Sequence, residues 1–326
     1  MVPSPRDLTL LRVARRAMAT TFEIAFPAGT PHAFDAGSAA LDLIEEIEEQ
    51  LTVYRDTGEV ARLNATAADG PIAASAELFG LLERCAAFTL DTAGAFDVAV
   101  GALVDTWANA KRAGRIPTAQ ELNDATARSG FRHVMLIHPP LSASERGPGG
   151  KVSGSTVQFR RAGLKLNFGA IGKGYALDRA ADLLKREWGI QSALLQGGGS
   201  SMLGLGAPPN DLRGWPVALR HPEPERPSLG TVHLKDRSFG TSAATFQCFE
   251  FAGKTYGHVL DPRTGRPADA TESASCLADS AAEADAISTA FFVAGAEWAA
   301  EFCRSRPRLG AVLLARGDLA RIGCAD

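Results

Sequence analysis

The chain has 326 residues and a formal net charge of -3, and 45% of its residues are hydrophobic. A chain of this length can bury a sizeable core, and its composition is that of an ordinary globular protein. Nucleic acid is excluded as a main partner, because binding many phosphates requires a basic surface. The five cysteines are scattered without a CxxC pair, which indicates reduced thiols. No apolar run approaches the ~20 residues of a membrane span, and no secretory signal is apparent, so the sequence predicts a cytoplasmic protein.

Apolar periodicity and turn residues predict helices and strands in irregular alternation. Ser75 is expected to cap a helix that ends near Gly94, and Thr118 with Glu121 forms a capping box for another. Strands are expected at residues 20–26, 134–137, 156–160, 164–167, 192–196, 217–220, 231–234 and 311–315, and further helices at residues 40–51, 175–188, 282–294 and 296–304. This order predicts an α+β fold with a mixed, largely antiparallel sheet and packed helices.

Two connections and one loop complete this outline. Residues 55–64 form a polar segment with an expected turn at Thr57, and the strands at 156–160 and 164–167 are expected to pair as a hairpin. Residues 139–154 are rich in Pro, Gly and Ser, which favours a long surface loop, inserted or mobile. Since no shift in composition divides the chain, we expect a single domain over residues 1–326.

A glycine-rich segment from Asn167 to Tyr175 places three glycines and Lys173 between an expected strand and an expected helix. Backbone amides at a helix N-terminus can hold phosphate, although a plain tight turn explains the same residues. The segment does not fit a Walker A loop, because Asn167 stands where the first glycine is required. A second run, Gly197 to Gly206, also permits close approach of a ligand to the backbone and equally fits a bulged connection.

Three oxygen-bearing side chains, Asp285, Ser288 and Thr289, share one face of an expected helix because they are three and four residues apart. A hard cation such as Mg²⁺ prefers oxygen ligands and keeps several waters, so one carboxylate with hydroxyl or carbonyl groups is a sufficient site. The alternative is that Asp285 simply stabilises the helix N-terminus electrostatically.

The segment from Gly257 to Gly265 contains a lone His258 in a short apolar run that ends at Asp261 and Pro262. Taken alone it predicts a strand followed by a stable turn, with Asp261 bonded to the turn backbone. Residues 239–245 form a hydroxyl-rich stretch upstream, but a Ser-His-Asp triad is disfavoured because the GxSxG elbow is absent.

Taken in order, these segments resemble the FAD:protein FMN transferase family, known as ApbE, over nearly the whole chain. The resemblance rests on motifs in the family's order at residues 18–22, 54–64, 94–101, 169–175, 258–265 and 284–289. It implies an ApbE-like fold and Mg²⁺-dependent transfer of the FMN moiety of FAD to a threonine of an acceptor protein, releasing AMP.

The resemblance also assigns residues to roles. Asp285 and Thr289 are similar to the metal ligands of the family, helped by Ser288 and the backbone carbonyl of Ala170. His258 is similar to the family histidine near the reacting phosphate and also lies among the flavin-nucleotide contacts, which otherwise match Met18, Tyr54, Ala95, Phe96, Asp97, Asn167 and Lys173.

The chain departs from the family pattern at a few positions. Asn167 stands where Asp is usual, Ala243 follows Ser242 where Gly is usual, and Phe246 stands where Tyr is frequent. The lipoprotein signal of many bacterial members is not seen. Two alternatives to transfer are therefore kept: an FAD pyrophosphatase that forms FMN and AMP, and an FAD-binding protein without turnover.

Overall fold

The structure is a computed structural model that describes residues 8–138, 154–223, 225–243 and 248–323. Its internal contacts define two compact units. The first unit comprises residues 1–48, 169–248 and 268–326, and the second comprises residues 49–168 and 249–267. Residues 139–153 of the expected surface loop lie outside the described residues. The mobility of that loop and the single domain therefore stay predictions.

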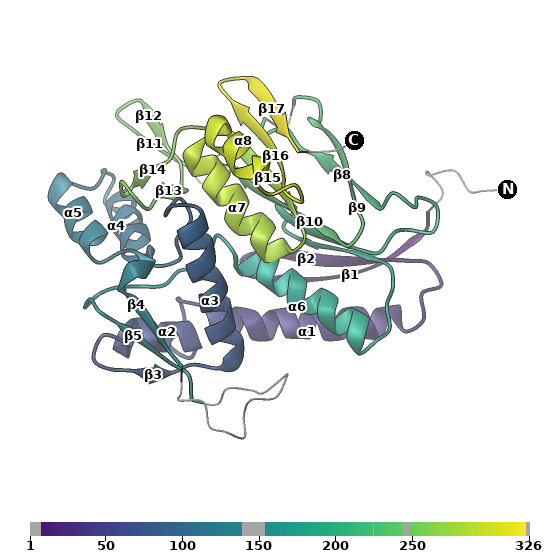
Figure 1. Ribbon diagram of the computed structural model, residues 1–326, viewed down its shortest axis with the longest axis horizontal. Coiled ribbons are helices and arrows are strands. Elements are labelled where there is room, and N and C mark those ends of the chain that lie inside the picture. The colour runs from purple at the N-terminus through teal and green to yellow at the C-terminus, as the bar shows by residue number, and fades with distance from the viewer. Residues whose placement is uncertain (1–7, 139–153, 224, 244–247, 324–326) are drawn as a thin grey trace. The chain divides into compact units, whose positions relative to one another are not determined.

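The first unit is built on an 8-stranded sheet in the order β1-β2-β6-β7-β10-β15-β16-β17, in which all neighbours are antiparallel (Figure 1). This confirms the expected α+β class with a largely antiparallel sheet. The strands are β1 (Leu10–Ala17), β2 (Thr20–Pro27), β6 (Ala193–Gly197), β7 (Ser201–Leu205), β10 (Arg237–Ala243), β15 (Ser273–Ala278), β16 (Gly310–Ala315) and β17 (Asp318–Ile322).

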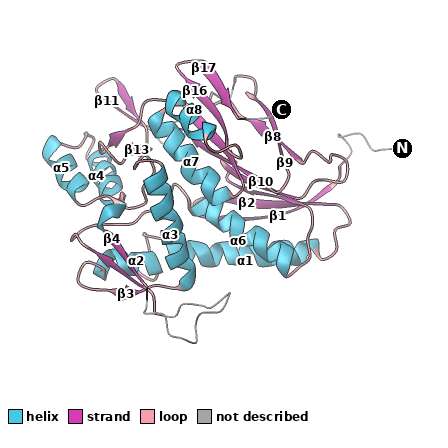
Figure 2. Ribbon diagram, viewed as in Figure 1, coloured by secondary structure: helices cyan, strands magenta, loops and turns pink. Residues whose placement is uncertain are grey.

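Helices cover one face of this sheet (Figure 2). They are α1 (Ala33–Leu51, of which residues up to 48 belong to the first unit), α6 (Gly172–Arg186), α7 (Ala281–Ala294) and α8 (Ala296–Arg304). On β2, Phe22 and Ile24 are fully buried, as alternation along a strand with one face toward a core requires. Helix α7 packs on β10 and β15, and α6 packs on β6 and β7.

A two-stranded ribbon covers part of the opposite face of the sheet. It consists of β8 (Trp215–Leu219) and β9 (Gly230–Leu234), paired antiparallel. The alternate residues Trp215, Val217 and Leu219 are buried against Met202 of β7 and Phe239 of β10 in one cluster. We call this face the ribbon side of the sheet and the other the helix side.

The second unit holds the remaining described elements. They are α2 (Glu59–Thr66), β3 (Ile72–Ala73), α3 (Ala76–Asp91), α4 (Gly101–Arg112), α5 (Ala119–Ala127), a 3₁₀ turn (Phe131–His133), β4 (Val134–Ile137), β5 (Thr156–Phe159), β11 (Phe249–Phe251), β12 (Lys254–Tyr256), β13 (Leu260–Asp261) and β14 (Arg266–Pro267). The expected caps are confirmed: Ser75 accepts a hydrogen bond from Leu78 N, and Thr118 and Glu121 form a complete capping box.

The expected hairpin between residues 156–160 and 164–167 is wrong. Strand β5 lies in the middle of the order β3-β5-β4, so both of its edges are already paired. The backbone of residues 164–167 pairs elsewhere: Lys165 O accepts from Gly101 N at 2.9 Å, and Asn167 N donates to Val98 O at 2.7 Å. Residues 164–167 thereby run beside the segment that precedes α4.

Other elements were not anticipated. Part of the polar segment at 55–64 forms α2, α4 is a full helix, and β17 follows β16. Their apolar residues are sparse, so periodicity gave a weak signal. Among the helices of the described residues, none has both the length and the apolar character needed to cross a bilayer.

Candidate functional site

Helix α7 carries the three expected metal ligands, and its start is fixed by two side chains. Ser280 is the N-cap and accepts a hydrogen bond from Glu283 N. Asp178 of α6 accepts from Ala281 N at 2.6 Å and from Ala282 N at 3.1 Å. These groups stabilise the helix N-terminus, and Asp285 lies one turn further along.

The Asp285 carboxylate is buried between α7, α6 and β7 on the helix side, with 6% of the residue exposed. Gly174 N donates to one oxygen at 2.8 Å, and Ser201 Oγ lies 2.8 and 3.0 Å from the two oxygens. Burial raises the pKa of Asp285 to about 6, although Lys173 and these two hydrogen bonds oppose the shift. A carboxylate desolvated in this way gains more from a cation than a solvated one does.

Two hydroxyl groups extend this oxygen-rich cluster. Ser288 Oγ and Thr289 Oγ1 each lie 3.0 Å from the backbone oxygen of Asp285. Ser242 Oγ of β10 lies 3.2 Å from Ser288 Oγ and 3.0 Å from Thr289 Oγ1. We call Asp285, Ser288, Thr289 and their partners Ser201 and Ser242 the Asp285 cluster.

The glycine-rich segment forms the start of α6, which begins at Gly172. A Cβ on Gly174 would lie 2.1 Å from Ala281 O, so only glycine lets α6 approach the start of α7 this closely. Lys173 is half-buried in the first turn, and Ala170 precedes it in the loop. The plain tight turn considered for this segment is therefore replaced by a helix start packed on α7.

Met18 occupies the two-residue turn between β1 and β2. Met18 and Ala19 both have positive φ, 49° and 59°. This is the backbone required by a type I′ hairpin turn, which Asn and Gly usually supply. Positive φ in such residues costs ~1 to 2 kcal/mol each, and strain of this kind is concentrated at functional sites.

In the second unit, Asp97 is buried and both of its oxygens are engaged. Oδ1 accepts from Ala99 N at 2.7 Å and Oδ2 from Phe131 N at 2.8 Å. Burial raises the pKa of Asp97, opposed by these two hydrogen bonds and by Arg132. Ala95 and Phe96 are each 1% exposed, so both residues are buried.

Asn167 and the turn after His258 lie close to this segment. Asn167 N bonds Val98 O, next to Asp97. A Cβ on Gly94 would lie 3.7 Å from Arg263 Cγ, which brings the turn at 262–265 beside the 94–97 segment. The second unit thus gathers Ala95, Phe96, Asp97 and Asn167 near the His258 turn.

The turn itself has the predicted structure. Asp261 O accepts from Thr264 N and Gly265 N, and the Asp261 carboxylate binds the backbone and guanidinium of Arg263. Trp107 Nε1 donates to Gly265 O at 2.8 Å, which anchors the turn on α4. Asp261 and Arg263 therefore shape the turn, and His258 is exposed just before it.

Tyr54 is 88% exposed in the segment before α2, where its N lies 3.3 Å from Thr52 Oγ1. Phe246 lies outside the described residues, and Ala243 ends β10. Because His258 and Asp285 belong to different units, the expectation that they line one pocket stays a prediction.

Sequence reasoning missed Ser201 and Asp178 as partners of α7. Ser201 lies 84 residues before Asp285, and Asp178 lies 103 residues before Ala281, so no local spacing links them. The only signal was indirect, because the glycine run at 197–206 and the entry to α6 each suggested a close backbone approach.

The donor set of the Asp285 cluster limits the metal that it can hold. Among the residues that the structure describes, no three His, Cys, Asp or Glu side chains come together as metal ligands. One carboxylate, hydroxyl groups and backbone carbonyls remain, a set of hard oxygen donors. These residues fit Mg²⁺ with part of its water shell, and they do not fit a metal that needs thiolate or imidazole.

The fold is that of an antiparallel α+β protein, and it carries a cluster of hard oxygen donors around Asp285. The chain belongs to the ApbE family, which it matches over residues 18–313. It is 34% identical over 298 residues to an FAD:protein FMN transferase of Treponema pallidum, covering 88% of this chain and 78% of that protein. A Klebsiella pneumoniae protein of the same name is 27% identical over 281 residues, covering 86% and 82%.

The fold is also that of a solved ApbE structure. The crystal structure of the ApbE protein of Thermotoga maritima superposes with a TM-score of 0.82 at 24% identity, covering 96% of this chain and 97% of that one.

Proposed function

We propose that this protein transfers the FMN moiety of FAD to a threonine hydroxyl of an acceptor protein and releases AMP. In this reaction the threonine oxygen forms a bond to the phosphorus of the FMN moiety. The bond from that phosphorus to the bridging oxygen breaks, and the bridging oxygen leaves with AMP. The observation that carries the proposal is the buried Asp285 carboxylate within a hydroxyl cluster, in a chain related to FAD:protein FMN transferases.

The Asp285 cluster is the proposed Mg²⁺ site, with Asp285, Ser288, Thr289 and the carbonyl of Ala170 as ligands. When bound, Mg²⁺ neutralises charge on the pyrophosphate oxygens. Ser201 and Gly174 hold the carboxylate in place, and Lys173 adds a second positive charge near it. Binding of Mg²⁺ and the attraction to Lys173 both need the Asp285 carboxylate to be ionised.

His258 is proposed to accept the proton of the threonine hydroxyl, because imidazole titrates near neutral pH. Its exposure before a rigid turn supports this role, since an approaching hydroxyl can reach it. His258→Ala should lower the transfer rate, because the variant lacks this base. An unchanged rate at every pH would remove His258 from the mechanism.

Met18, Tyr54, Ala95, Phe96, Asp97, Asn167 and Lys173 are the proposed contacts to FAD. Ala95 and Phe96 are buried beside Asp97 in the chain. Tyr54 is the residue of this set whose side chain is open to stack on a ring. A Tyr54→Ala variant should therefore raise the KM for FAD.

The test is incubation with FAD, Mg²⁺ and a threonine-bearing acceptor protein, followed by mass spectrometry of the mixture. Transfer predicts an acceptor heavier by one FMN moiety and an equal amount of AMP. Matched controls are the same acceptor with Thr→Val and the Asp285→Asn enzyme, and neither should give a labelled acceptor. Free FMN and AMP without label would instead identify an FAD pyrophosphatase.

After the FAD pyrophosphatase, a non-catalytic FAD-binding protein is the third candidate. It is favoured by Asn167 where the family has Asp, and by the engagement of both Asp97 oxygens with backbone amides. It predicts FAD binding with no AMP release at any Mg²⁺ concentration. The proposal of FMN transfer includes a cytoplasmic location, and it therefore calls for an acceptor protein in that compartment.

A further inference from the structure

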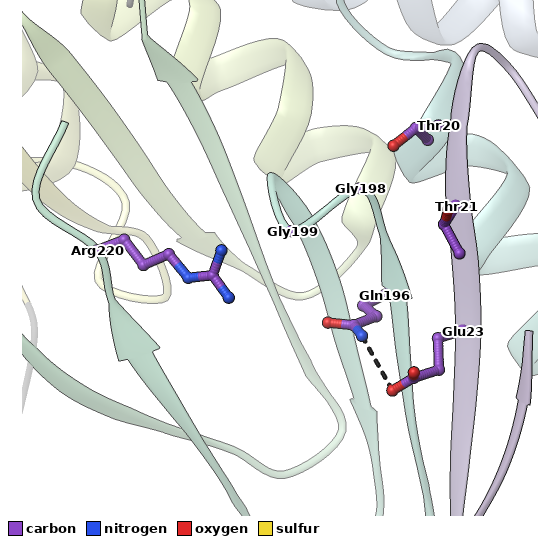
Figure 3. Close-up of a pocket in the computed structure, with 7 residues that line it drawn as sticks. All are labelled: Thr20, Thr21, Glu23, Gln196, Gly198, Gly199 and Arg220. Carbon is purple, nitrogen blue, oxygen red and sulfur yellow. Dashed lines mark hydrogen bonds between the residues drawn. The ribbon is translucent and has the colours of Figure 1, made fainter. Parts of the chain in front are cut away.

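A polar pocket lies on the ribbon side of the first unit's sheet (Figure 3). It encloses about 330 Å³ and is lined by Thr20, Thr21 and Glu23 of β2, Gln196 of β6, Gly198 and Gly199 of the β6–β7 turn, and Arg220 at the end of β8. Glu23 alternates with Phe22 and Ile24, which face the helices, so the pocket opens on the other face from Asp285. None of the residues assigned above to the metal or to FAD lines it.

Two charged side chains line the pocket, and only one of them has a partner among the described residues. Glu23 forms an ion pair with Arg12, and its Oε1 accepts a hydrogen bond from Gln196 Nε2 at 3.0 Å. Arg220 is exposed and forms no ion pair or hydrogen bond within the described part of the chain. The carboxylate is thus already neutralised, and the guanidinium remains to attract an anion.

The turn between β6 and β7 lies close to this guanidinium. Gly198 and Gly199 have φ of +64° and +73°, a left-handed backbone that glycine adopts without strain. A Cβ on Gly199 would lie 3.8 Å from Arg220 Nη1, and Figure 3 shows the guanidinium extended toward the turn. Gly198 N donates to Thr21 O, whereas Gly199 N and Ser200 N make no hydrogen bond to the described residues.

We propose that this pocket binds an oxyanion, a phosphate or a carboxylate, between the Arg220 guanidinium and the amides of Gly199 and Ser200. Successive amides in a left-handed turn form a concave anion site, and a guanidinium binds two oxygens of one group at once. No aromatic side chain lines the pocket, so a flavin or adenine ring has no stacking partner there.

The biological source of the anion rests on the proposed function. Two sources offer the same chemistry: a phosphate of the nucleotide, and an acidic side chain of the acceptor protein near its threonine. The turn leads directly into Ser201, which holds Asp285. An anion bound at the turn would therefore lie one residue along the chain from Ser201, on the opposite face of the sheet from the Asp285 carboxylate.

The test of the pocket itself is a titration with inorganic phosphate, followed by 1H–15N TROSY spectra of the full chain. The amide signals of Gly199 and Ser200 should shift, and Arg220→Ala should weaken the apparent affinity ~10-fold or more, as loss of a charge-assisted hydrogen bond implies. Arg220→Lys should weaken it less. Arg226→Ala removes an exposed charge from the same β8–β9 connection and should leave the affinity unchanged. Equal affinity in Arg220→Ala would overturn the proposal.

Transfer kinetics then distinguish the two sources. A higher KM for FAD in Arg220→Ala assigns the anion to the nucleotide, and a higher KM for the acceptor at saturating FAD assigns it to the acceptor. If phosphate binds and neither KM changes, the bound phosphate is an adventitious ion only, and the pocket has no role in the transfer reaction. Should the protein prove to transfer no flavin at all, the phosphate titration still decides whether the pocket binds an anion.

Discussion

Ser201 Oγ lies within hydrogen-bonding distance of both oxygens of the Asp285 carboxylate, at 2.8 and 3.0 Å. Both residues are buried, with 0% of Ser201 and 6% of Asp285 exposed. A strand of the sheet thus fixes the orientation of the carboxylate that α7 supplies.

Ser201→Ala should lower the free energy of unfolding by ~1.5 to 3 kcal/mol, because the buried carboxylate loses a donor that nothing replaces. It should also weaken Mg²⁺ binding, measured by isothermal titration calorimetry. Ser200→Ala is the matched control, since Ser200 lies in the adjacent turn and its backbone oxygen, not its side chain, accepts from Thr241 N. Equal Mg²⁺ affinity in both variants would contradict the role given to Ser201.

Asp178→Ala should destabilise the protein by ~1 to 2 kcal/mol, because Asp178 accepts from the first two amides of α7. Urea unfolding measures this loss. The control is Asp182→Ala on the same helix, where an exposed carboxylate lies 3.8 Å from Arg186. That change should stay within ~0.5 kcal/mol. Similar losses in both variants would show that the cap on α7 adds nothing.

Much of the fold was accessible from local patterns, and the reasons are visible in particular elements. Ser75 and the pair Thr118 with Glu121 marked helix starts because capping depends on neighbours in the sequence. The pairing of residues 164–167 was not accessible, because it depends on which edges of β5 are already occupied. Long-range pairing of this kind has no local signature.

The same difference between local and long-range signals applies to the residues of the candidate site. Spacing alone placed Asp285, Ser288 and Thr289 on one helix face, and proline and glycine marked the turn after His258. Ser201 and Asp178 escaped because tertiary packing brings them to α7 from distant strands and helices. Partners across a fold therefore need the structure, whereas residues one turn apart do not.

The metal-free protein should show a pH-dependent contribution from Asp97. Burial raises the pKa of folded Asp97 above its ordinary value, so the folded state binds the proton more tightly than the unfolded state. The stabilisation is fully present below the unfolded pKa of ~3.9 and is lost as pH rises through the folded pKa. The unfolding free energy of the wild type should therefore rise relative to that of Asp97→Asn, which has no proton to bind at this position, as pH falls toward that range. Parallel pH profiles of the two proteins in urea titrations would rule out this linkage.

Gly174→Ala should destabilise the protein by ~3 kcal/mol or more, at the upper end of overpacking effects. The new Cβ would lie 2.1 Å from Ala281 O and 2.7 Å from Ala282 N, both backbone atoms that cannot rotate away. Gly80→Ala in α3 is the matched control, because a Cβ there meets nothing within 4 Å. It should stabilise the protein by ~0.5 to 1 kcal/mol, since alanine loses less entropy in a helix. Thermal unfolding of both variants measures the contrast. A Gly174→Ala variant as stable as wild type would mean that α6 and α7 can separate without cost, and Asp285 would then lose its fixed contact with Gly174 N.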